Sequence, residues 1–220
     1  MRERPKNKGY KIEGMAKMDN RYQQKRENYL VMLYFGPGDY LTRCVERAYR
    51  DFCRTLEGEG KSEESMKEEA VLKLVGRFWE IQEKPEMTSD QAAFDIWHEE
   101  SCQMLVDHYN SGYRLTIGQA QKWINMTFKY IFTMGEERIP GFEGFYSFCH
   151  IPLDSIILEE LEKPPYLIKN PWKVAWSKIN HYGEYLDYQK RVREMSAPIA
   201  PLEMEFDLFM KGMNDRYMGK

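Results

Sequence analysis

The 220-residue sequence has no uncharged apolar run that approaches the roughly 18 to 20 residues needed for a membrane-spanning helix. Residues 1–14 also lack the apolar centre of a secretory signal. We therefore expect no membrane partner and a chain that stays in the reducing cytoplasm. With 42% hydrophobic and 14% aromatic residues, the composition is typical of a globular protein with a sizeable core.

Cysteine is scarce, and its spacing forms neither a CxxC pair nor a zinc-ribbon pattern, which predicts free thiols rather than a disulfide scaffold. His98 and Cys102 stand four residues apart and Cys149-His150 could add ligands, but no second regular spacing supports them. We therefore expect no metal site. The four cysteines are Cys44, Cys53, Cys102 and Cys149.

Common nucleotide and hydrolase signatures are missing as well. The sequence has no GxGxxG fingerprint, no Walker loop and no GxSxG elbow. Dinucleotide-binding, P-loop and serine-hydrolase functions thus have no support, and no cofactor is expected.

Charge is plentiful but segregated along the chain. The 32 basic and 35 acidic residues give a net charge of −3, yet residues 1–26 hold nine basic against three acidic residues, a net of +6. Such a segment could contact phosphates electrostatically, and a solvated disordered tail would have the same composition. We assign residues 1–20 to a basic flexible arm and residues 21–220 to a single helical domain.

Apolar residues recur mostly at intervals of three and four, and alternating strand patterns are scarce, so we predict an all-α, compact multi-helix fold with room for two lobes around a cleft. Thr88 and Gln91 resemble a capping box. The predicted helices cover about 39–56, 65–83, a stretch from this box to 108, 117–134, 154–161, 181–194 and 202–213.

The helix at 117–134 carries the most informative side chains. One face is apolar, whereas Gln119, Lys122, Asn125 and Lys129 fall on the opposite face when plotted at 100° per residue. A solvent-facing stripe is one interpretation. The absence of carboxylates from this face, and its bulky flanking residues, favour a functional surface instead.

This helix and the later His150-Ile151-Pro152-Leu153-Asp154 segment resemble the active-site region of helix-hairpin-helix DNA glycosylases, nearest the archaeal 8-oxoguanine glycosylase branch. That branch also has a second lysine seven positions after the first, as Lys129 follows Lys122. The resemblance covers about 40 residues. It departs from the family where the hairpin before the lysine usually reads Leu-Pro-Gly-x-Gly, because Leu115-Thr116-Ile117-Gly118 supplies one glycine and no proline.

The resemblance implies catalytic roles for Lys122, as the nucleophile, and for Asp154, as the residue that assists it. A neutral lysine amine would attack the sugar carbon and expel the base, leaving a Schiff base that can decay with strand cleavage. Lysine is nucleophilic only when deprotonated, so burial would have to lower its pKa. Asp154 could also be a helix N-cap, and the sequence leaves both roles open.

Binding of an extruded base would require an aromatic face and polar edges. Trp172 and Trp176 would be one turn apart if their segment were helical, and residues 163–193 combine seven basic residues with several tyrosines. These aromatics could equally be core residues. The expected base- or DNA-binding residues are Gln119, Asn125, Lys129, His150, Trp172 and Trp176.

The sequence therefore predicts a DNA glycosylase, with or without lyase activity, whose partner is DNA carrying a damaged or modified base. The alternative is a non-catalytic α-helical module that binds nucleic acid or protein. A helical protein without nucleic-acid contact is a third interpretation, favoured by the pI near 5.9.

Overall fold

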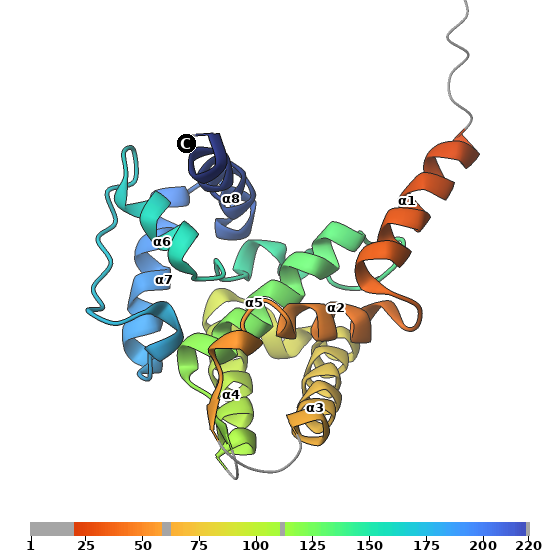
Figure 1. Ribbon diagram of the computed structural model, residues 1–220, viewed down its shortest axis with the longest axis horizontal. Helices are drawn as coiled ribbons and strands as arrows, with labels where there is room; N and C mark the ends of the chain where they lie inside the picture. Colours follow the sequence, from red (N-terminus) through yellow and green to blue (C-terminus); the bar gives the residue numbers. More distant parts are fainter. Residues whose placement is uncertain (1–19, 59–62, 111–112, 219–220) are drawn as a thin grey trace, which may run out of the picture. The chain divides into compact units, whose positions relative to one another are not determined.

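The computed structural model describes residues 20–58, 63–110 and 113–218 (Figure 1). The predicted basic arm therefore lies, except for Asn20, outside the described residues. The chain divides into two compact units, residues 1–37 and 38–220, and each is described by itself. Within the described residues, none of the helices combines the length and the apolar composition that a membrane span requires.

Helices dominate both units, so the all-α prediction is confirmed. Four short 3₁₀ segments, η1 to η4, cover Cys53–Thr55, Pro85–Thr88, Glu143–Phe148 and Trp176–Lys178. The α-helices are α1 (Asn20–Phe35), α2 (Tyr40–Tyr49), α3 (Glu63–Glu83), α4 (Gln91–Tyr109), α5 (Ile117–Met134), α6 (Ser155–Glu162), α7 (Tyr182–Ser196) and α8 (Pro201–Met218).

Helix α1 was not among the helices predicted from the sequence, although residues 20–35 contain neither proline nor glycine. It ends at Gly36, whose φ of 84° favours glycine and whose N–H donates to the carbonyl of Met32 at 2.9 Å. Most of its large apolar side chains are exposed, Leu30 by 61% and Leu33 by 69%. Apolarity on several sides of a helix, instead of on one stripe, gives the weak amphipathic pattern that periodicity analysis overlooks.

Helix α5 is the centre of the second unit and packs against α2 and α4 (Figure 1). Its bounds are those predicted. Thr116 and Gln119 form a reciprocal capping box at its N-terminus. The box predicted at Thr88 is wrong, because Thr88 lies in η2 and the carboxylate of Asp90 caps α4 by accepting from the N–H of Ala93.

All of α5 except Phe132 and Thr133 is buried, including the polar face. The interpretation of that face as a solvent-facing stripe is therefore wrong. The first half of the apolar side packs on Tyr49 and Phe52, whose rings lie 5.1 and 5.3 Å from Trp123. Farther along, Phe128 lies 4.8 Å from Phe78, so aromatic contacts fix both halves of the helix.

The chain before α5 is tied down by a two-stranded antiparallel ladder, in which β1 (Glu57–Gly58) pairs with β2 (Tyr113–Arg114). After α5, the loop at residues 135–154 returns along the helix and ends at Asp154, the N-cap of α6. Helix α6 packs on α8, where Gly212 permits close approach, since a Cβ there would lie 2.5 Å from the side chain of Ile156.

Candidate functional site

Lys122 and Asp154, the two predicted catalytic residues, are in direct contact. The ammonium Nζ of Lys122 donates to Oδ2 of Asp154 at 2.7 Å, although 32 residues separate them in sequence. The lysine side chain is 4% exposed and the aspartate side chain 17% exposed. The fold thus places a buried lysine from α5 against a carboxylate at the start of α6.

Asp154 caps α6 and also contacts Lys122. Its Oδ1 accepts from the backbone N–H groups of Ile156 and Ile157 at 2.8 and 2.9 Å, which caps α6, while Oδ2 faces Lys122. Burial alone would raise the pKa of this carboxyl, but the Lys122 charge and these hydrogen bonds hold it below its ordinary value. Asp154 is therefore a carboxylate that stays ionised and is a weak base.

The backbone N–H groups of Gly118 and Gln119, at the N-terminus of α5, already donate to groups inside the protein and are not free to bind a phosphate. The N–H of Gly118 donates to the carbonyl of Ile179 at 2.9 Å, and the N–H of Gln119 to the hydroxyl of Thr116. A Cβ on Gly118 would lie 1.9 Å from the carbonyl oxygen of Trp176. Gly118, the single glycine of the segment compared with the glycosylase hairpin, therefore allows η4 to pack closely against α5.

The amide of Gln119, a predicted base-binding group, is occupied inside the protein. Its Oε1 accepts from the Thr116 N–H at 2.9 Å, and its Nε2 donates to the carbonyl and hydroxyl oxygens of Thr55. The side chain joins the start of α5 to η1, and at 1% residue exposure it has no open face.

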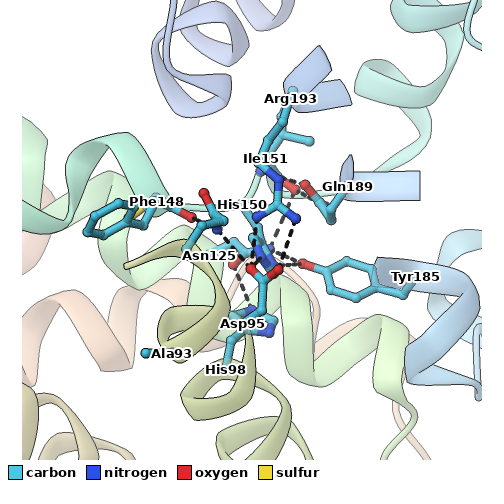
Figure 2. A network of polar contacts seen from close by, with 12 residues as sticks. Ala93, Asp95, His98, Asn125, Phe148, His150, Ile151, Tyr185, Gln189 and Arg193 are labelled. Carbon is cyan, nitrogen blue, oxygen red and sulfur yellow. Dashed lines mark hydrogen bonds and ion pairs between the residues drawn. The ribbon is translucent and has the colours of Figure 1, made fainter. Parts of the chain in front are cut away.

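Asn125 and His150 belong to a buried polar network (Figure 2). Asn125 Nδ2 donates to the hydroxyl of Tyr185 at 2.9 Å, which is 2.9 Å from His150 Nδ1. His150 Nε2 lies 2.8 Å from Asp95 Oδ1, and the carboxylate must accept there. Tyr185 therefore donates to Nδ1 of a neutral His150.

The network ends in charged groups on one side and a second histidine on the other. Arg193 donates to both carboxylate oxygens of Asp95, at 2.8 and 2.9 Å. His98 Nε2 lies 2.9 Å from Asn125 Oδ1 and must donate to it. Burial is the main cause that lowers the pKa of both histidines, so each is neutral in the folded chain.

Two glutamines fasten the loop that delivers Asp154. Gln189 contacts both backbone polar groups of Ile151, accepting from its N–H at 3.1 Å and donating to its carbonyl at 2.9 Å. Gln121 does the same for Leu153, at 3.3 and 3.1 Å. Together with the histidine network, these amides connect α5 and α7 to the loop and position the carboxylate beside Lys122.

Lys129 pairs with Glu205 of α8, its Nζ donating to Oε1 at 2.8 Å. The ammonium also lies 4.5 Å from the ring centroid of Phe209. Burial raises the pKa of Glu205 above its ordinary value, and the Lys129 charge offsets this only in part. Lys129, the second lysine of the resemblance, therefore connects α5 to α8 rather than contacting Lys122.

Trp172 and Trp176 do not lie on one helix, because residues 171–175 are irregular and Trp176 begins η4. The ring of Trp172 lies 5.0 Å from that of Tyr188. Within the described residues, the Trp172 Nε1 and the Tyr188 hydroxyl are buried without a hydrogen-bond partner. The helical spacing considered for the two tryptophans is thus wrong.

The four cysteines are free thiols, as predicted, and Cys102 lies 3.6 Å from His98 Nδ1. Across residues 20–58, 63–110 and 113–218, no group of three or more histidine, cysteine or acidic side chains is arranged to hold a metal ion.

A pocket of about 600 Å³ lies near the C-terminal end of α5, and neither Lys122 nor Asp154 lines it. The contact between Lys122 and Asp154 therefore lies outside this pocket.

The side chains that support the pair come from α4 and α7, and no local motif distinguishes them. Asp95 and Gln189 were not predicted. Tyr185 and Arg193 belong to the basic, aromatic 163–193 segment considered for base binding, but both lie in the buried network. Comparisons with protein-family models, with curated proteins and with solved structures found no match for this chain.

Proposed function

We propose that the protein is a DNA glycosylase that removes a damaged or modified base, with Lys122 as the nucleophile and Asp154 as the group that stabilises positive charge. The observation that carries the proposal is the 2.7 Å contact between Lys122 Nζ and Asp154 Oδ2 in a water-poor setting. The resemblance to helix-hairpin-helix glycosylases independently points to the same two residues.

The chemistry would proceed as follows. The lone pair of a neutral Lys122 amine attacks the sugar carbon that bears the base, and the carbon–nitrogen bond to the base breaks with its electron pair leaving on the base. A proton leaves the attacking nitrogen and a proton reaches the departing base. Opening of the sugar ring then gives a Schiff base, from which loss of a sugar proton can expel the 3′ phosphate.

Asp154 is better suited to stabilise positive charge on the sugar than to accept a proton. Its pKa lies below the ordinary value, so it holds a negative charge near the sugar and is a poor general base. Substrate binding must also open the contact, because the lysine is buried and its ammonium already donates to the carboxylate. The exposed basic residues of the 163–193 segment, among them Lys169, Lys173 and Arg191, would supply phosphate contacts.

Borohydride trapping tests the proposal. The panel consists of oligonucleotides that carry oxidised, deaminated, alkylated or hypermodified bases, and wild type is compared with Lys122→Arg and Lys122→Gln. Lys122→Arg keeps the positive charge beside Asp154 but cannot form the trapped adduct. A covalent adduct in wild type that both variants lose supports the mechanism.

Lys129→Gln is the matched control, since it removes a buried, paired lysine of the same helix. If its folding is retained, as judged by circular dichroism, it should still give the adduct. An adduct that persists in both Lys122 variants, or base release that they leave unchanged, would refute the assignment of Lys122.

A non-catalytic binding module is the second candidate, and helix α1 is the observation that favours it. Tyr29, Leu30 and Leu33 are each exposed by more than 60%, on the same helix as the basic residues Arg21 and Lys25. A DNA affinity that falls steeply with salt, is unchanged in Lys122→Gln and comes with no base release would favour this function.

A further inference from the structure

The pocket of about 600 Å³ near the end of α5 is lined by aromatic and acidic side chains and does not include Lys122. It is formed by the last turns of α5, the loop that follows, η3 and α8. Its volume lies in the range of small-molecule sites. Nine residues separate Lys122 from Ile131 in the pocket wall, about 14 Å along the helix axis, so this is a different place from the proposed nucleophile.

Aromatic rings make up much of the pocket wall. Phe132 and Tyr146 meet edge to face, with ring centroids 4.6 Å apart and an interplanar angle of 79°. Phe142 is almost completely buried, and Phe206 contributes from α8, where its ring centroid lies 5.1 Å from the Lys129 ammonium. Since Phe142 also contacts Phe145 at 6.0 Å, the rings are held by the core. Aromatic faces carry negative electrostatic potential and attract cations.

The charges of the lining are all of one sign. Glu136 and Glu143 line the pocket, and no basic residue does so. The carboxylate of Glu136 is held in place, since it accepts from the backbone N–H groups of Gly141 and Glu143. No ion pair to Glu143 is formed by any residue that the structure describes.

Two further features make the potential more negative. The C-terminal end of α5, at Met134, has the negative end of the helix dipole. A third carboxylate, Glu203, is close enough that, after burial, it is the next cause that raises the pKa of Tyr146. The nearby Arg138 does not line the pocket, but it donates to the carbonyl of Met134 and so offsets part of this negative end.

We propose that this pocket binds an organic cation, an ammonium that carries an apolar or aromatic body. The charge would lie near Glu136 and Glu143, and the body would contact Phe132, Tyr146 and Phe206. This site is independent of the proposed glycosylase chemistry, so either proposal can fail without the other.

Binding is tested on the full chain with benzyltrimethylammonium as the probe, by isothermal titration calorimetry and by chemical-shift changes. Benzenesulfonate, an anion with a similar ring, and neutral benzyl alcohol are the comparison ligands. We expect a dissociation constant of about 1 mM or tighter for the cation. The anion should not bind, and the alcohol should bind at least about tenfold more weakly than the cation.

Substitutions of lining residues test whether the cation binds in this pocket. Glu143→Gln should weaken cation binding about three- to tenfold, and Phe206→Leu, which keeps an apolar side chain without the ring, about two- to fivefold. Glu137→Gln is the matched control, since it removes the same charge one residue from Glu136 outside the lining. It should change the affinity less than twofold, because its carboxylate does not line the pocket and water screens it from the bound charge.

No binding of the cation, equal binding of cation and neutral alcohol, or equal effects of Glu143→Gln and Glu137→Gln would each overturn the proposal. Because Glu143 is exposed, folding should survive its substitution. Loss of borohydride trapping in the Lys122 variants has no bearing on these outcomes.

Discussion

Acidification should destabilise this protein well above the pH at which carboxylates titrate, because His98 and His150 are buried in their neutral form. Burial lowers the pKa of both imidazoles, and it does so most strongly for His98, which is fully buried beside Tyr182 and Asn125. In the unfolded chain each would take up a proton near pH 6.5. Unfolding therefore binds protons as the pH falls below this value, and stability is lost in that direction.

The magnitude follows from proton linkage. For each histidine that stays neutral in the folded chain, the free energy of unfolding falls by about 1.4 kcal/mol between pH 7.5 and pH 5.5. His98 should supply this full amount. His150 should supply less, because its hydrogen bond to Asp95 favours the charged form. The Asp95 carboxyl, whose pKa is lowered, loses its contribution only at much lower pH.

Urea unfolding at the two pH values, followed by tryptophan fluorescence and by far-ultraviolet circular dichroism under reducing conditions, measures the effect. The raised pKa of Glu205 acts in the opposite sense, so the informative quantity is a difference between variants. His98→Gln should reduce the pH-dependent loss by about 1.4 kcal/mol. His181→Gln, at an exposed position, should leave it unchanged. An equal loss in wild type and His98→Gln would refute the reasoning.

Three other substitutions test packing and capping. Gly118→Ala should destabilise the fold by about 3 kcal/mol or more, since its Cβ would clash with the Trp176 carbonyl; a melting temperature within 2 °C of wild type would contradict this. Asp154→Asn keeps an N-cap side chain, so in urea titrations it should be more stable than Asp154→Ala by about 1 kcal/mol. Glu205→Leu leaves the Lys129 ammonium buried without its carboxylate and should cost about 3 kcal/mol in the same assay, whereas a neutral effect would show that the pair adds little.

Much of the fold was predictable from the sequence because local rules and tertiary demands agree. Helix α5 was predicted with its observed bounds, and Asp154 was predicted to begin α6. Helix α1 was missed because its apolar residues surround the helix instead of forming a stripe. The box at Thr88 failed because η2 lies there and Asp90, one residue before α4, provides the cap.

The candidate site was likewise predictable only in part. Sequence resemblance paired Lys122 with Asp154, but the groups that support them come from α4 and α7 and left no local signal. Gln119, Asn125 and Lys129 were predicted from a wheel with one polar face, and a wheel cannot show that other helices cover that face. His150 was predicted from the segment that carries the resemblance, and a local segment cannot show that its side chain is buried.

The sequence by itself determined the helical character of the chain and the bounds of its central helix, since spacing and capping act over a few residues. The candidate lysine and aspartate came from a family resemblance, not from these local rules. Only the tertiary structure decided that the polar face of α5 is buried, that its amides and lysines have partners inside the protein, and that an acidic aromatic pocket lies near the end of α5. The physical reason is that burial and hydrogen-bond pairing depend on which distant segments meet, and those contacts are set by packing of the whole chain.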